Sequence, residues 1–304
     1  MQDVTGKDLL GRRPTTFDYA CMSLLTYRDM DEDDIRQDTI SDAIENDTRL
    51  PAEKLKLSVD AWHRLRHAGW EVLEQCRCDS GMICTVFFHS ERQQLVFSYR
   101  GTQPSNIKSV KADIFHVMRD RAGIINDDAV SIAKRYAKHR VFEKYKFLQV
   151  STTGHSLGAW EAELVVFQLK LEFAMHLREL PGAYARIWAV TFESPGSRSL
   201  MESKENRPGM LHKTNIVDTL DITAYMSKPN YINTFNRQAA TCLYQITGEA
   251  IGSARGTIQV HDMATVYAGM QEVAHRAPHP PPLPGLALSP VGLWTDVVQR
   301  TGRH

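Results

Sequence analysis

The segment around Ser156 constrains the fold more than any other part of the chain. A compact apolar run at 147–152 leads directly into the pattern Gly154-x-Ser156-x-Gly158, and a long helical pattern follows to about residue 180. A second buried strand is expected at 187–192. Strand, helix and strand in this order form a βαβ unit, in which the two strands are parallel and the crossover is right-handed. The chain is therefore predicted to be an α/β protein.

Three more strands are expected before this unit, at 71–76, 82–88 and 95–99, where the apolar period changes from helical to extended. The turns between them are short, and short turns join antiparallel neighbours. The sequence therefore predicts a central, mostly parallel sheet flanked by helices, with an antiparallel N-terminal strand region. A further strand is expected at 215–223. Helices are expected at 15–27, 127–145 and 261–275.

The 304 residues divide into three predicted parts. Residues 1–60 form a helical and acidic lead, because the first fifty residues carry twelve acidic and only six basic side chains. Residues 61–275 form the α/β domain. Residues 276–304 form a proline-rich tail, with six prolines between 277 and 290.

Composition excludes several classes of partner. Lys+Arg and Asp+Glu are both 36, and this balance argues against a nucleic-acid partner. The five scattered cysteines do not form a disulfide framework or a metal-binding spacing, so neither a metal nor a cofactor is expected. The N-terminus has no secretory pattern, and no apolar run is long enough to span a membrane. A cytoplasmic location is expected, and export without an N-terminal signal stays open.

The pattern around Ser156 has a physical reason. A nucleophile must stand out from a tight turn between a strand and a helix, and glycines on both sides let the neighbouring backbones approach. The N–H of Leu157 then lies at a helix N-terminus, where it can stabilise an oxyanion. The alternative reading of the pattern is a glycine-rich turn that is capped by a serine.

A nucleophilic serine needs a histidine base and an acid that orients the histidine. In proteins whose nucleophilic serine lies in a strand–turn–helix pattern of this kind, the chain order is serine, acid, histidine. His261 follows an expected strand at 257–260 and precedes the last helix, which is where a catalytic loop presents a side chain. Asp218 and Asp221 both follow an apolar stretch, and the residues alone do not decide between them as the acid.

Four segments of the chain stand in a recognisable order: 96–102, 153–159, 189–196 and 215–222. Together they resemble the class 3, or fungal-type, lipases of the α/β-hydrolase fold, as a divergent branch. In that family the corresponding motifs are a strand that ends in Arg-Gly-Ser/Thr, a nucleophile turn, a strand that ends in a Phe-Gly-x-Pro turn, and an Asp segment.

The resemblance implies a role for each candidate residue. Ser156 would be the nucleophile and His261 the general base, and Asp221 is favoured over Asp218 as the acid. The oxyanion hole would be formed by Thr102 and Leu157. The implied activity is that of a carboxylic ester hydrolase, lipase-like or phospholipase A1-like, which cleaves acyl lipids through an acyl-enzyme.

Two positions depart from the family pattern, and the second, in the acid region, motivates an alternative. Glu193 replaces the glycine after the strand at 187–192, and the segment 226–234 differs from the family's proline-rich turn. The alternative is a pseudo-lipase that has lost turnover and acts as an interaction module.

Residues 103–122 occupy the place of the family's lid. They combine apolar side chains with four basic ones, so an amphipathic helix could contact a membrane or lipid surface. The alternative for this segment is a packed surface helix.

Overall fold

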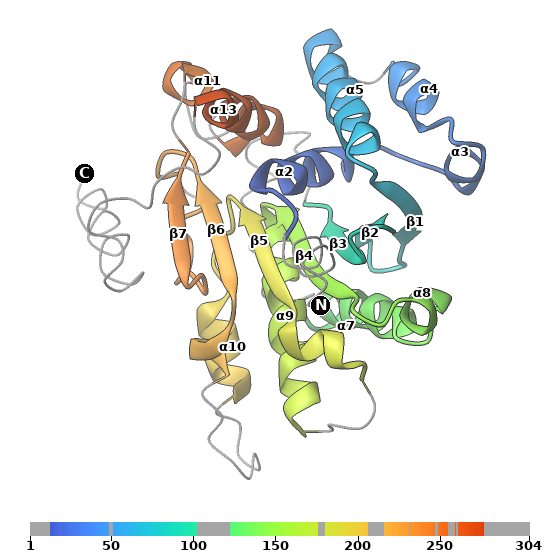
Figure 1. Ribbon diagram of the computed structural model, residues 1–304. Coiled ribbons are helices and arrows are strands. Elements are labelled where there is room, and N and C mark those ends of the chain that lie inside the picture. The colour runs from blue at the N-terminus through green and yellow to red at the C-terminus, as the bar shows by residue number, and fades with distance from the viewer. Residues whose placement is uncertain are drawn as a thin grey trace, which may run out of the picture.

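The computed structural model describes residues 13–48, 51–101, 122–175, 180–205, 216–230, 232–246, 249–254, 259 and 261–276. Seven strands form one sheet in the order of the chain, from β1 to β7. The first two pairings are antiparallel and the four that follow are parallel. Helices cover both faces of the sheet (Figure 1). The predicted α/β-hydrolase fold, with its antiparallel start, is confirmed. The strands are β1 (Glu71–Arg77), β2 (Ile83–His89), β3 (Gln94–Tyr99), β4 (Gln149–His155), β5 (Trp188–Phe192), β6 (Ile222–Met226) and β7 (Cys242–Gln245).

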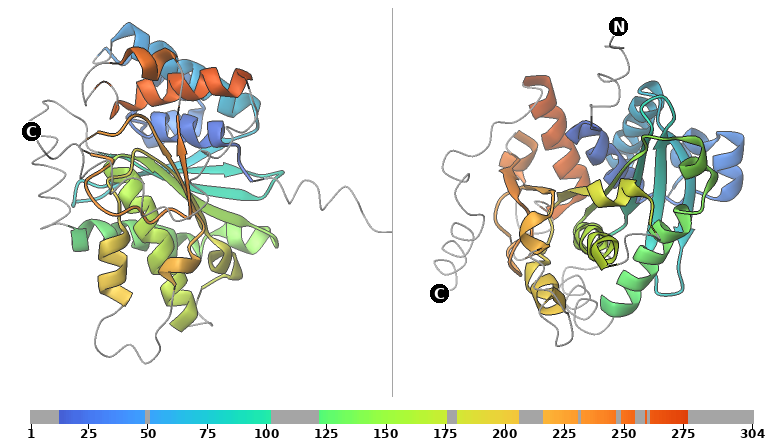
Figure 2. Two further views of the ribbon diagram at one scale, coloured as in Figure 1. Left: turned by 90° about the vertical axis from the view of Figure 1, so that its left-hand side faces the viewer. Right: turned by 60° about the horizontal axis from the view of Figure 1, so that its bottom comes forward.

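The two helical layers are made by different parts of the chain (Figure 2). One layer combines the N-terminal helices with the last ones: α2 (Thr16–Leu25), α3 (Glu32–Gln37), α4 (Ile40–Glu45), α5 (Ala52–His67), α11 (Glu249–Ser253) and α13 (Met263–Arg276). The other layer combines α7 (Ala122–Tyr136), α8 (Arg140–Lys144), α9 (Leu157–Met175) and α10 (Arg198–Glu205). Two short 3-10 turns, η2 (Gly182–Arg186) and η3 (Val217–Thr219), precede β5 and β6.

Alternation along the strands divides the core into two clusters, one on each face of the sheet. In β2 and β3, Phe87 and Val96 belong to the cluster under α2 and α13, whereas Val86 and Phe97 belong to the cluster over α7 and α9. Successive side chains of a strand point to opposite faces, so a sheet that is covered on both sides buries every position. β3 is buried along its whole length, as this arrangement requires.

Helix α2 is attached to the sheet by hydrogen bonds as well as by apolar contacts. Tyr19 donates to the Ser151 hydroxyl at 2.9 Å, and the hydroxyls of Ser23 and Thr153 are 3.0 Å apart. Thr15 begins the helix with a capping box that also involves Asp18. Helix α2 of the acidic lead thus packs directly against the sheet. The predicted division between this lead and the domain at residue 60 stays a prediction.

Two predicted elements differ from the structure. The helix expected at 127–145 is broken into α7 and α8 by a turn at 137–139. The strand expected at 215–223 begins only at Ile222, because the N–H and the hydroxyl of Thr219 both bond to the carbonyl of Ile216 and close η3. The expected tail at 276–304 falls outside the described residues except for its first position.

No helix in the described part of the chain is long and apolar enough to cross a membrane.

Candidate active site

Ser156 occupies a sharp turn between β4 and α9. Its φ is +59°, a left-handed conformation that side chains other than glycine adopt rarely. A Cβ atom on Gly154 would lie 2.3 Å from the Gly158 carbonyl oxygen, and one on Gly158 would lie 2.1 Å from the Tyr99 carbonyl oxygen. The N–H of Ser156 donates to the carbonyl of Phe192 in the neighbouring strand at 3.0 Å. The turn is thus fixed by close backbone packing that only glycine permits.

The structure brings His261 to Ser156, although 105 positions separate them in the chain. The His261 Nε2 atom lies 2.8 Å from the Ser156 hydroxyl oxygen. Both residues are buried. The next residue, Asp262, pairs with Lys54 of α5 at 3.0 Å, which ties the start of the last helix to the N-terminal layer.

The other ring nitrogen of His261 faces Glu193. The Nδ1 atom lies 3.3 Å from the Glu193 carboxylate, whose residue is fully buried directly after β5. Glu193 also has a left-handed φ of +55°, and its N–H donates to the Tyr225 carbonyl at 2.9 Å. Since a carboxylate accepts, Nδ1 carries the proton and Nε2 is left to accept the proton of the Ser156 hydroxyl.

The Glu193 carboxylate also receives hydrogen bonds from the loop after β6. The side-chain amides of Asn230 and Asn233 donate to Oε2 at 2.7 Å and 2.9 Å. The backbone N–H of Ser227 donates to Oε1. These donors replace the water that a buried carboxylate has lost, so the negative charge is stabilised locally.

His155 is a second buried histidine beside the site. Its Nε2 atom lies 2.6 Å from the His261 carbonyl oxygen, and its Nδ1 atom lies 2.9 Å from the Tyr27 hydroxyl. A carbonyl only accepts, so His155 donates through Nε2 and accepts from Tyr27 through Nδ1. Burial, with His261 as a smaller contribution, holds the pKa of His155 well below its ordinary value. The neutral His155 therefore connects Tyr27, which follows α2, to the backbone of His261.

The two aspartates that the sequence offered as acids lie elsewhere. Asp221 precedes β6, and its carboxylate pairs with Arg13 at 2.5 Å while its side chain stays 42% exposed. Asp218 lies in η3 and pairs with Arg198 at 2.5 Å. The amino ends of parallel strands lie at the opposite edge of the sheet from the carboxyl ends. Both aspartates are therefore at the edge away from Ser156, while Glu193 follows the carboxyl end of its strand.

The expected oxyanion hole is described only in part. Leu157 is the first residue of α9, so its N–H has no acceptor within the helix. Thr102 lies outside the described residues, and so do residues 103–121 of the expected lid. The preceding Gly101 packs against the turn so closely that a Cβ atom would lie 2.4 Å from the His155 carbonyl oxygen and 3.2 Å from the Ser156 Cβ.

Arg100 holds the end of β3 in place. Its guanidinium donates to the carbonyls of Thr26 and Arg28 at 2.6 Å and 2.9 Å. It also pairs with Asp29 at 2.9 Å. Arg100 is thus a structural residue that fixes the loop after β3 against the end of α2.

A second buried carboxylate, Glu163 of α9, contacts residues on both sides of Glu193 in the chain. It accepts hydrogen bonds from Thr191 at 3.1 Å and from Ser197. Burial raises the pKa of Glu163 to about 7, and the hydrogen bonds from Ser197, Ser194 and Thr191 offset only part of this increase.

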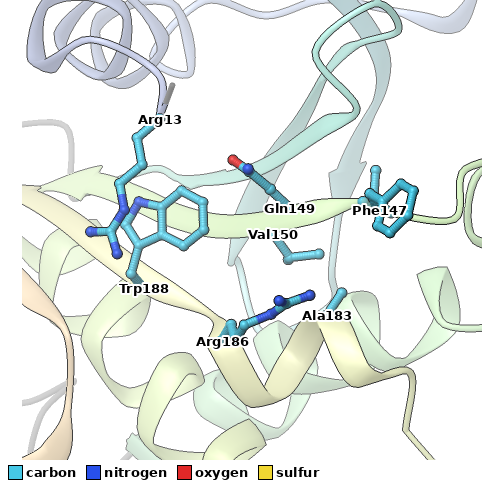
Figure 3. A pocket seen from close by; sticks show the side chains of 8 residues that line it. Arg13, Phe147, Gln149, Val150, Ala183, Arg186 and Trp188 are labelled. Atoms are coloured by element: carbon cyan, nitrogen blue, oxygen red, sulfur yellow. The ribbon is translucent and has the colours of Figure 1, made fainter. Parts of the chain in front are cut away.

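A pocket of about 280 Å³ lies at the amino ends of β4 and β5, away from Ser156 (Figure 3). The guanidinium of Arg13 stacks on the Trp188 ring at 4.5 Å from its centroid, while the same group pairs with Asp221. The positive charge of Arg13 is therefore already paired with the Asp221 carboxylate. The lining residues are Arg13, Phe147, Leu148, Gln149, Val150, Ala183, Arg186 and Trp188.

Among the described residues, no group of three or more His, Cys, Asp and Glu side chains is arranged to hold a metal ion.

Glu193 is the site residue that sequence reasoning did not assign a role. The position itself was a signal, because Glu193 directly follows a buried strand, just as the turn around Ser156 does. The residue stood out only as a departure from the family's glycine.

No family model and no curated protein sequence matches this chain. Solved structures with similar folds include fungal lipases, the kind of protein that the four sequence motifs resemble. The Rhizomucor miehei triacylglyceride lipase is 12% identical, with 77% of this chain and 80% of that chain covered and a TM-score of 0.40. The Lip2 lipase of Yarrowia lipolytica is 16% identical, with 72% of each chain covered and a TM-score of 0.39. A mutant form of MDLA from Penicillium cyclopium is 13% identical, with 81% and 82% covered and a TM-score of 0.48. At these identities the likeness concerns the fold.

Proposed function

We propose that this protein is a serine hydrolase that cleaves carboxylic esters of acyl lipids, with Ser156, His261 and Glu193 as its catalytic triad. The observation that carries the proposal is the hydrogen-bonded chain from the Ser156 hydroxyl through both ring nitrogens of His261 to the buried Glu193 carboxylate. In this proposal Glu193 takes the role that the family resemblance implied for Asp221, whose carboxylate pairs with Arg13.

The reaction follows from this geometry. The Ser156 oxygen attacks the ester carbonyl carbon while its proton passes to His261 Nε2. The tetrahedral intermediate collapses, the bond to the alcohol breaks, and the alcohol leaves with that proton. His261 then takes a proton from water, whose oxygen attacks the acyl-enzyme. The bond between the acyl carbon and the Ser156 oxygen breaks, His261 returns its proton to that oxygen, and the carboxylic acid is released. Glu193 keeps the proton of His261 on Nδ1 and stabilises the imidazolium that forms.

The oxyanion would be held by the N–H of Leu157 and by Thr102. Each donor of such a hole contributes roughly 3 kcal/mol to the lowering of the barrier. Gly101, which adjoins Thr102, lies against the nucleophile turn, and this position supports the assignment.

Acyl-lipid esters are the proposed substrate class because the four motifs resemble those of class 3 lipases. Residues 103–122 are the proposed lipid-contacting segment, on the strength of their sequence pattern. A cytoplasmic location remains part of the proposal.

The alternative, an inactive interaction module, was motivated by the altered acid segment. The presence of Glu193 beside His261 favours the enzyme, since the neighbouring strand end supplies a carboxylate to His261 while Asp221 pairs with Arg13.

The test is labelling with a fluorophosphonate probe together with hydrolysis of p-nitrophenyl esters and dispersed acylglycerols. We expect labelling and hydrolysis that both disappear in Ser156→Ala and His261→Ala. Full ester hydrolysis by Ser156→Ala would overturn the proposal, and a wild-type protein that is silent with lipid present would favour the interaction module.

A further inference from the structure

The loop after β6 is built around two asparagines whose amide groups point at one carboxylate. Asn230 and Asn233 both donate to Oε2 of Glu193, the oxygen that also faces His261. Both asparagines are buried. The loop thus places two uncharged donors around the oxygen that orients the base.

The asparagines are themselves fixed by the backbone around them. The Asn230 side-chain oxygen accepts from the N–H groups of Ile232 and Asn233 at 2.9 Å and 3.1 Å. The Asn233 side-chain oxygen accepts from the Asn230 N–H at 2.9 Å. Both amide nitrogens also donate to the Lys228 carbonyl, at 3.2 Å and 3.1 Å. With the oxygens engaged in this way, neither amide can rotate without breaking bonds, so the N–H₂ groups must face Glu193.

A third contact attaches this loop to the loop of the acid. The side-chain amide of Gln238 donates to the carbonyls of Ser194 and Asn233, each at 2.9 Å. Gln238 therefore bridges the residue after Glu193 and one of the two asparagines.

We propose that Asn230 and Asn233 form an amide clamp, a pair of positioning residues that hold the Glu193 carboxylate against Nδ1 of His261. The inference rests on the proposed function, because the clamp acts on catalysis only through Glu193 and His261. A glutamate side chain has one more rotatable bond than an aspartate, and its loss of rotamer freedom must be offset by contacts that fix its end. The clamp supplies those contacts from the strand end next to the one that carries the acid.

Replacement of each asparagine by aspartate tests the clamp with little change in shape. Asn230→Asp and Asn233→Asp keep the oxygen that holds the loop but turn the donor that faces Glu193 into a charged acceptor. The matched control is Asn236→Asp, which is exposed in the same loop. We expect kcat to fall about 100-fold in the two clamp variants with KM nearly unchanged, since a misplaced catalytic group affects the chemical step. The control should stay within about twofold of wild type.

A double-mutant cycle separates positioning from general stability. In a Glu193→Gln background, the aspartate at either clamp position should change kcat by less than about threefold, because the group that the clamp holds as an anion is gone. Equal losses in both backgrounds would overturn the clamp. Thermal midpoints identify any aspartate variant that does not fold. In that case Asn233→Ala, which adds no charge, replaces it in the same double-mutant cycle.

A spectroscopic signature tests the clamp without turnover. A hydrogen-bonded Nδ1 proton of His261 should give a low-field proton resonance in the wild-type protein that is lost in His261→Ala and shifted in Asn230→Asp. If the resonance is present and unchanged in both clamp variants, the clamp is wrong even where the enzyme is active. If the resonance behaves as expected while no ester is cleaved, the proposed hydrolase fails and the positioning of Glu193 stands.

Discussion

The imidazole of His261 lies 3.3 Å from the carboxylate of Glu193, a residue that follows β5 and precedes the two candidate aspartates in the chain. The proposed triad keeps the order serine, acid, histidine, but its proposed acid comes from the strand end next to the expected one. His261 therefore takes its orientation from the carboxyl edge of the sheet, where Ser156 also lies.

Glu193→Gln should lower kcat/KM by about four orders of magnitude, because an amide in place of the carboxylate favours the wrong histidine tautomer. Steady-state ester hydrolysis measures the effect. Asp221→Asn is the control, and it should leave kcat/KM unchanged and alter the free energy of unfolding by less than about 1 kcal/mol, as expected for an exposed ion pair. A large loss in Asp221→Asn with a small loss in Glu193→Gln would reverse the assignment.

Glu163→Gln should change how stability depends on pH. Burial raises the pKa of Glu163 from 4.5 in the unfolded chain to about 7 in the folded one, so the folded state binds the proton more tightly. Its favourable contribution is complete below pH 4.5 and is lost as the pH rises towards 7. The variant should abolish this loss, which is on the order of 3 kcal/mol. Urea unfolding at about pH 5 and about pH 8 measures it. The same pH dependence in wild type and variant would contradict the prediction.

Gly158→Ala should prevent the nucleophile turn from closing. The new methyl group would lie 2.1 Å from the Tyr99 carbonyl oxygen, so β3 and α9 must separate. We expect a loss of about 3 kcal/mol or more of stability, together with loss of fluorophosphonate labelling. Gly123→Ala in α7 is the control, because no atom lies within 4 Å of the added group. That change should stabilise the protein by up to about 1 kcal/mol. Equal effects of the two substitutions would show that close packing at the turn is unimportant.

Tyr27→Phe should destabilise the protein by about 1 to 3 kcal/mol, because it leaves the buried Nδ1 atom of His155 without its donor. Tyr145→Phe is a suitable comparison, since the described part of the structure gives the Tyr145 side chain ring contacts rather than a hydroxyl hydrogen bond. Chemical denaturation of both variants measures the difference. A Tyr27 variant as stable as the Tyr145 variant would show that the His155 contact contributes nothing.

Much of the fold could be predicted from the sequence, because its strands are marked by local patterns. The strands from β1 to β5 carry apolar runs bounded by turns, and the glycines around Ser156 mark the nucleophile turn. The sequence predicted one helix where the structure has α7 and α8, because the apolar period continues across the turn between them.

The acid of the proposed triad could not be predicted from the sequence, for a reason of strand placement. Ile216 and Val217 look like the start of a strand, but Thr219 closes a 3-10 turn and the strand begins at Ile222. A shift of a few residues moves Asp221 from the expected carboxyl end to the amino end of β6. Whether a polar residue lies at one edge of the sheet or the other depends on pairing with a neighbouring strand, which local periodicity does not contain.

The parallel run from β3 to β7 makes neighbouring strand ends interchangeable as attachment points for a side chain. A carboxylate after either of two neighbouring strands can lie at the same edge without any change in register or connectivity. For the histidine, only the location of the negative charge matters, and the loop that delivers it is secondary. In this sheet, therefore, the place of a carboxylate along the sheet edge says more about its contact with His261 than its place in the chain does.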